Sequence, residues 1–139
     1  MSDLGLTHIA LPVNKVDASV VFYAKYARME VVHSRVDAES GVKVVWLTDH
    51  TRPFVLVLAE IAPVGTPLLP FAHLGVGCAS REEVDRLCEL ARSEGCLRSG
   101  PTDSGYPIGY WAFIADPDGH TLEVAFGQEV ALTVAQAWQ

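Results

Sequence analysis

The chain has 139 residues, of which 50% are hydrophobic and 19% are charged, so we expect one domain with a hydrophobic core and exclude a disordered or fibrous chain. The formal net charge is −7 and the ten Lys and Arg residues are scattered, which argues against binding to nucleic acid or to an anionic membrane. The sequence shows no signal peptide and no apolar run of the roughly 18 residues that a membrane span needs. Three cysteines without a metal-ligand spacing favour a reduced, cytoplasmic protein.

The first predicted strand is the segment THIALPV, residues 7–13. Side chains alternate between the two faces of a strand, so bulky residues share one face while His8 and Ala10 share the other. A helix is predicted over residues 17–27, and three strand-like runs follow at residues 30–34, 42–48 and 54–60. Residues 61–71 contain three prolines and are expected to form a linker.

The second half opens with a similar phrase, AHLGVGC at residues 72–78, in which His73 faces away from the bulky residues. A helix is predicted over residues 80–94, because Ser80 and Glu83 have the spacing of a capping box and Gly95 is placed as a stop. Strands are predicted at residues 96–98, 109–115 and 121–126, and residues 101–107 are expected to form a flexible loop. DPDG at residues 116–119 fits a type I turn. Residues 128–139 are expected to form a short helix or tail that lies over the body.

Both halves therefore show the order strand, helix, strand, strand, strand. We expect a single domain with an α+β fold, in which paired βαβββ modules form a half-open barrel around a cavity. Module one is expected at residues 1–60, the linker at 61–71, module two at 72–127 and the tail at 128–139. The small and polar faces of three strands carry His8, His73 and Glu123, and a face of this kind lines a cavity more readily than it fills a core. These three side chains are predicted to point into the shared cavity.

The order and spacing of HIAL, HLGV, SVVFYAKY and the terminal DPDGHTLEV resemble the vicinal oxygen chelate superfamily, which contains glyoxalase I, fosfomycin-resistance enzymes, extradiol dioxygenases and bleomycin-binding proteins. The resemblance covers nearly the whole chain. It implies that a divalent metal (Fe, Mn, Ni, Co or Zn) is held by His8, His73 and Glu123. Members with four ligands carry a further Glu on the fourth strand of module one, where this chain has Val57, so the resemblance implies a three-ligand site.

Two imidazoles and one carboxylate would leave positions on a metal open for water and substrate, which points to chemistry at that metal. A lone strand histidine is more often a hydrogen-bonded core residue, and a lone inward Glu is more often part of a salt bridge. A buried Glu together with two neutral histidines, without a buried Arg partner, would be costly unless a cation is bound. The other histidines, at positions 33, 50 and 120, are expected to be solvent-facing or structural.

Trp46, Trp111 and Phe113 are candidates for an apolar wall that binds substrate, the alternative being ordinary core packing. Phe113 stands where extradiol dioxygenases and fosfomycin enzymes commonly have Tyr. The candidates for a general base are Tyr106, a released metal ligand or a metal hydroxide. The resemblance implies a lyase or isomerase that chelates a small oxygenated substrate by Lewis-acid catalysis. The alternatives are an iron-dependent extradiol-type dioxygenase and a metal-free antibiotic-binding protein. A homodimer is expected, because open half-barrels leave sheet edges and an apolar rim.

Overall fold

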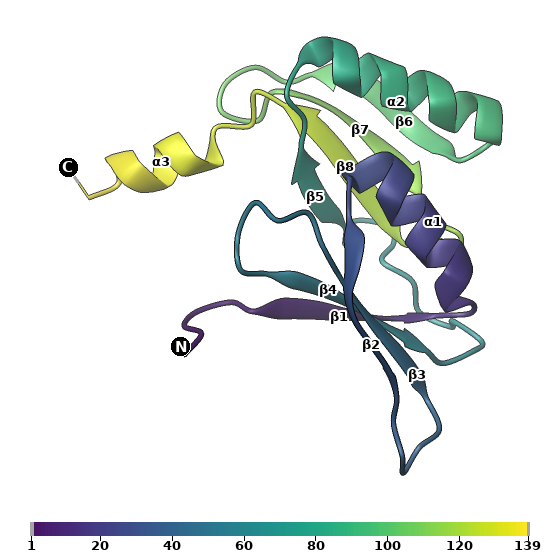
Figure 1. Cartoon of the computed structure of the whole chain (residues 1–139). Coiled ribbons are helices and arrows are strands. Elements are labelled where there is room, and N and C mark those ends of the chain that lie inside the picture. Colours follow the sequence, from purple (N-terminus) through teal and green to yellow (C-terminus); the bar gives the residue numbers. More distant parts are fainter. Residues whose placement is uncertain (1, 139) are drawn as a thin grey trace. The chain divides into compact units, whose positions relative to one another are not determined.

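The structure, a computed structural model, describes residues 2–138, which form two four-stranded sheets and three helices (Figure 1). The chain divides into two compact units between Pro67 and Leu68. Each unit has the order strand, helix, strand, strand, strand, so the prediction of an α+β fold with two βαβββ modules is confirmed.

The first unit contains β1 (His8–Val13), α1 (Val16–Ala27), β2 (Glu30–Val36), β3 (Lys43–Thr48) and β4 (Val55–Glu60). Its sheet has the order β1-β4-β3-β2, in which β1 runs parallel to β4 and the other pairs are antiparallel. Helix α1 packs against β2, β3 and β4. In β1 and β4 the buried side chains lie at alternating positions, as the sequence pattern predicted, whereas β3 buries residues on both of its faces. With α1 they form one core that includes Leu11, Val13, Tyr23, Leu47, Leu56 and Leu58.

Helix α1 obtains its N-terminal cap from a distant part of the first unit. Lys15, the residue before the helix, makes no side-chain capping bond. Instead the backbone N–H of Val16 donates to Oε2 of Glu60, at the end of β4, over 3.0 Å. A carboxylate at this end also interacts favourably with the helix dipole. The cap thereby joins the start of α1 to the end of β4.

The second unit contains β5 (Leu74–Gly77), α2 (Arg81–Glu94), β6 (Leu97–Asp103), β7 (Tyr110–Ala115) and β8 (Thr121–Phe126), with the sheet order β5-β8-β7-β6. Helix α2 packs against β6, β7 and β8. Ser80 caps the helix as predicted, because the Glu83 N–H donates to Ser80 Oγ over 3.1 Å, and the Glu83 carboxylate accepts from the N–H of Ala79, one residue before Ser80. Gly95 ends the helix in the left-handed conformation, as predicted.

The expectation of a flexible loop at residues 101–107 is wrong for its first part, because β6 continues to Asp103. The pairing of β6 with β7 shifts in register between Ser99 and Thr102, and Pro101 lies at this irregularity of an edge strand. Proline is tolerated in a sheet at such positions because no ladder bond needs its missing N–H. The predicted turn between β7 and β8 is confirmed by the bond from the Gly119 N–H to the Asp116 carbonyl, 3.1 Å.

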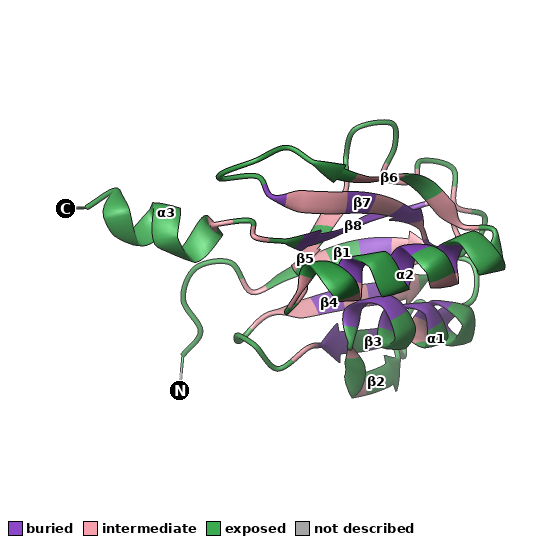
Figure 2. Ribbon diagram, turned by 90° about the horizontal axis from the view of Figure 1, so that it is seen from above, coloured by how far each residue is buried: buried purple, intermediate pink, exposed green. Residues whose placement is uncertain are grey.

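The C-terminal segment forms a short helix, α3 (Val130–Gln136). The expectation that it lies over the body is wrong, because none of its residues is buried, and Figure 2 shows it exposed throughout. Among the described residues, no helix has both the length and the apolar character that crossing a membrane requires.

Candidate functional site

The two sheets have matching registers, which makes positions in the first unit equivalent to positions in the second. In the first unit Ala10, two residues after His8, pairs with Val57, which pairs in turn with Trp46. In the second unit Gly75, two residues after His73, pairs with Glu123, which pairs with Phe113. Val57 is therefore the counterpart of Glu123, and Trp46 is the counterpart of Phe113. Only the second unit has a carboxylate at this position.

Glu123 and His73 lie on the same face of the second sheet, linked by Phe113. The Phe113 ring lies 5.0 Å from the His73 ring, measured between centroids, and Phe113 is the cross-strand neighbour of Glu123. Glu123 is 8% exposed, and its Oε2 accepts a bond from Gln128 Nε2 over 3.2 Å. In the described part of the chain, no Lys or Arg forms an ion pair with this carboxylate.

Both strand-start histidines use Nδ1 for hydrogen bonding. Nδ1 of His73, which lies just before β5, donates to the Phe71 carbonyl over 2.6 Å, so in the neutral ring Nε2 keeps its lone pair. Nδ1 of His8 is hydrogen-bonded to the Thr7 hydroxyl over 2.9 Å. Metal-ligating histidines are typically oriented by such a bond from the second ring nitrogen. The Nδ1 bond of His73 leaves its Nε2 free to bind a divalent cation, and His8 has the same arrangement when its Nδ1 donates to the Thr7 hydroxyl.

Residues 2–138 contain no group of three or more His, Cys, Asp or Glu side chains gathered to hold a metal ion. His8 belongs to the first unit, whereas His73 and Glu123 belong to the second. The three predicted ligands therefore come from both units, and their joint coordination of a cation stays a prediction.

The first unit has a hollow of about 670 Å³ on the sheet face that carries His8. Trp46, predicted to contact substrate, lines this hollow together with Val55 and Val57. Trp46 is 37% exposed, and its ring centroid lies 4.7 Å from that of His33. This volume is within the usual range for small-molecule sites.

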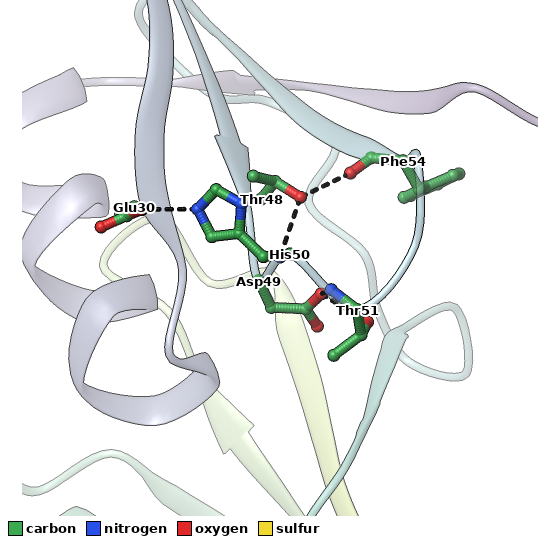
Figure 3. Close-up of polar contacts among 6 residues, drawn as sticks. All are labelled: Glu30, Thr48, Asp49, His50, Thr51 and Phe54. Carbon is green, nitrogen blue, oxygen red and sulfur yellow. Dashed lines mark hydrogen bonds and ion pairs between the residues drawn. The ribbon is translucent and has the colours of Figure 1, made fainter. Parts of the chain in front are cut away.

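The turn between β3 and β4, which borders the hollow, is held by side-chain hydrogen bonds (Figure 3). The Thr48 hydroxyl donates to the Phe54 carbonyl over 2.9 Å and accepts from the His50 N–H over 3.2 Å. Asp49 accepts from both the N–H and the hydroxyl of Thr51. His50 has a φ of 62°, an unusual conformation for a residue other than glycine, and its Nε2 bonds Oε1 of Glu30 on β2 over 2.5 Å. The turn is therefore fixed to the sheet at several points.

Trp111 and Phe113, the other two predicted substrate contacts, lie side by side on β7 of the second unit. Their ring centroids are 4.8 Å apart, and Trp111 Nε1 donates to Ser104 Oγ over 2.9 Å. With His73 they form a continuous row of rings, to which Phe71 adds a further contact at 5.7 Å. Both predicted residues are half-buried and so remain available to a ligand.

Tyr106, a candidate for the general base, lies in the loop between β6 and β7 and is 68% exposed. The start of this loop is anchored by Asp103, whose carboxylate accepts from Arg81 Nη1 and from the Gly105 N–H, each over 2.9 Å. The bond from Arg81, reinforced by that from Gly105, holds the pKa of Asp103 below its usual value. The Arg81 guanidinium also lies 3.8 Å from the centroid of the Tyr110 ring.

The structure shows which residues surround the three histidines that were not predicted to bind metal. His33 contacts Trp46, and His50 lines the hollow of the first unit. His120 is 1% exposed, and its Nδ1 accepts from the Leu68 N–H over 3.0 Å. His120 is therefore structural.

Sequence reasoning missed Arg52, which also lines the hollow. Nothing in the sequence pattern distinguishes this residue, because it occupies an irregular turn where neither the helical nor the strand period assigns a face. The left-handed conformation of His50 could not be predicted from the sequence either, because histidine does not indicate a positive φ as glycine does.

The model of the Glyoxalase/Bleomycin resistance protein/Dioxygenase superfamily matches residues 5–124. An uncharacterized protein of Pseudomonas aeruginosa, PA2024, is 36% identical over 129 residues, which cover 88% of this chain and 89% of that protein.

Similar solved structures share the fold at low sequence identity. The fosfomycin resistance protein FosX from Listeria monocytogenes, solved as a variant with Mn(II) and 1S,2S-dihydroxypropylphosphonic acid, superposes with a TM-score of 0.71 at 18% identity, covering 96% of this chain and 99% of that one. The trypanothione-dependent glyoxalase I of Leishmania major gives a TM-score of 0.70 at 22% identity, with coverages of 97% and 94%. A possible glyoxalase from Bacillus cereus gives 0.68 at 23% identity, with coverages of 88% and 99%.

Proposed function

This chain belongs to the glyoxalase/bleomycin resistance protein/dioxygenase superfamily, and on that premise we propose that it is a divalent-metal-dependent lyase or isomerase that acts on a small oxygenated organic substrate. His8, His73 and Glu123 are the proposed metal ligands. The FosX structure with Mn(II) is a precedent for a metal in this fold.

The environment of Glu123 is the observation that carries the proposal. This carboxylate is 8% exposed, and among residues 2–138 it has an amide donor, Gln128, but no cationic partner. Burial of a carboxylate without a countercharge is costly, and a bound cation removes that cost. The nearby His73, already oriented through Nδ1, supplies a second donor of the type that Fe, Mn, Ni, Co and Zn accept.

The bound cation would supply Lewis acidity toward neighbouring oxygen atoms of the substrate. His8, His73 and Glu123 would hold it, and the hydrogen bonds at Nδ1 of both histidines would keep their rings in orientation. Phe113 and Trp111 would exclude water on the side of the second unit, while Trp46 would contact the substrate in the first. The Tyr106 hydroxyl, on a loop anchored by Asp103, remains the candidate for moving a proton.

Metal analysis of protein purified without chelators tests the ligand set. We expect about one divalent metal per chain, and we expect His8→Ala, His73→Ala and Glu123→Gln each to weaken metal binding at least tenfold, because each removes one of three ligands. His50→Asn is the matched control, since it replaces an exposed histidine by a residue that tolerates positive φ. Full occupancy in the His73→Ala protein would overturn the assignment.

We propose further that the reaction does not consume oxygen. Phe113 places an apolar ring next to His73 and on the strand beside Glu123, so this position offers no hydroxyl donor. Assays without oxygen, on hydroxy-ketone, thiohemiacetal and catechol substrates with iron, manganese, nickel and zinc, are expected to show undiminished turnover. Turnover of catechols with iron alone, with stoichiometric oxygen uptake, would instead establish the dioxygenase alternative. Absence of metal would favour the binding-protein alternative.

A further inference from the structure

The hollow of the first unit combines an apolar floor with an unused positive charge. Its apolar lining is formed by Val32, Trp46, Pro53, Phe54, Val55 and Val57. Arg52 lines the same hollow, is exposed, and in the described part of the chain makes no side-chain hydrogen bond or ion pair. The other lining arginine, Arg35, is already paired with Asp37 over 2.7 Å. Arg52 is therefore the free guanidinium of this hollow.

The turn that carries Arg52 is held by hydrogen bonds within the first unit. The hydrogen bonds of Thr48 and Asp49 fix the backbone on either side, and the bond between His50 and Glu30 attaches the turn to β2 (Figure 3). The Phe54 N–H donates to the Arg52 carbonyl over 2.8 Å, which closes the turn around Pro53. A guanidinium carried on a fixed backbone loses less conformational freedom when it binds an anion.

We propose that this hollow selects an organic carboxylic acid with an apolar or aromatic body. Arg52 pairs with the carboxylate, and Trp46, Val55 and Val57 contact the body of the molecule. The inference rests on the proposed function, because His8 lines the same hollow and the acid is then the substrate of the metal-dependent reaction.

A singly charged carboxylate fits better than a doubly charged phosphate or phosphonate. One unpaired guanidinium matches one carboxylate through two parallel hydrogen bonds. Among the described lining residues the one acidic side chain, that of Asp3, adds a negative charge to the same hollow. The chain as a whole has a net charge of −7, which further disfavours multiply charged anions.

Ligand binding to chelator-treated protein, followed by calorimetry or NMR titration, tests the inference without the metal. Naphthylacetate and its neutral isostere naphthylacetamide are the paired probes, and naphthylphosphonate is the doubly charged one. We expect the acid to bind about tenfold or more tightly than the amide. Arg52→Ala should remove this preference and Arg52→Lys should retain part of it. Trp46→Ala should weaken the acid and the amide equally.

Arg86→Ala is the matched control, since Arg86 is an exposed arginine on α2 of the second unit with no ion pair in the described part of the chain. Equal affinity for the acid and the amide, tighter binding of the phosphonate, or the same loss in Arg52→Ala and Arg86→Ala would overturn the inference. His73→Ala separates the two proposals: it should lose metal yet keep the preference for the acid. If the wild-type protein holds no metal but shows an Arg52-dependent preference, the proposed function fails and the binding inference stands.

Discussion

Gly75 keeps space open beside the Glu123 carboxylate. It lies on the same strand face as His73, and a methyl group added at this position would lie 3.5 Å from Glu123 Oε2 without a clash. A larger branched side chain would occupy the space that a cation needs next to the carboxylate, since metal–oxygen distances are only about 2.0–2.2 Å.

We therefore expect Gly75→Val to lower metal affinity about tenfold, comparable with the effect of changing other residues around a metal site. Gly77→Val is the control, because Gly77 is the next residue on the same face and an added Cβ there would meet nothing within 4 Å. Competition with a fluorescent chelator measures both affinities. Equal affinity in the two variants would contradict a cation at Glu123.

Tyr110 illustrates how a single hydrogen bond changes proton affinity. Its hydroxyl donates to the Asp85 carboxylate on α2, and this bond raises the pKa of Tyr110 above its usual value. Because the pKa of Tyr110 is higher in the folded protein than in the unfolded chain, where it is about 10, protonated Tyr110 stabilises the fold. This contribution is fully present below about pH 10 and is lost as the pH rises through the pKa of the folded state.

An ultraviolet titration should therefore show the Tyr110 signal, identified as the one missing in Tyr110→Phe, moving to lower pH in Asp85→Asn. Thermal unfolding should show the wild-type protein losing stability above about pH 10 relative to Tyr110→Phe. Glu89→Gln is the control, because Glu89 lies one turn later on α2 and pairs with Arg92 instead. An unchanged titration in Asp85→Asn would show that the bond does not control Tyr110.

At the scale of elements, the fold followed from patterns that act locally. Alternation placed Leu122 and Val124 in the core, and the Ser80–Glu83 capping box marked the start of α2. The cap of α1 was beyond such reasoning, because Glu60 reaches Val16 from 44 residues away. The extent of β6 was also missed, since its irregular pairing lets Pro101 remain in an edge strand.

Part of the candidate site could likewise be predicted from local sequence patterns, and part of it could not. Strand alternation singled out His8, His73 and Glu123 as one polar set, because it requires only the local period. To predict that Arg52 lines the hollow, one would need the shape of the turn, which depends on hydrogen bonds of Thr48, Asp49 and His50. Neither amino-acid composition nor the periodicity of hydrophobic residues predicts those bonds, so a binding residue in a turn is identified only from the structure.

At the scale of the whole molecule, apolar surface remains exposed on separate segments. Leu4 and Leu6 are 90% and 88% exposed, and α3 presents Val130, Leu132 and Val134. β1 is an edge strand of the first described sheet and β5 is an edge strand of the second, and each pairs with one strand of its sheet. Exposed apolar surface and strand edges of this kind favour self-association.

We expect a homodimer at micromolar concentration, and sedimentation velocity measures it. If the ligands of one metal come from both chains, mixing His8→Ala with His73→Ala chains should restore part of the metal content that each variant loses alone. Dimers of two His73→Ala chains are the control and should restore none. A monomer in sedimentation would contradict the prediction.

The matching registers of the two units have a consequence for how this protein can change. Glu123 and its counterpart Val57 stand at equivalent positions, yet one is a donor and the other is part of an apolar floor. Substitutions at Val57, Val55 or Trp46 alter the shape of that floor without removing a proposed metal ligand. Under the proposed function, the substrate range can therefore change through the apolar floor of the first module, while His8, His73 and Glu123 keep the proposed metal site.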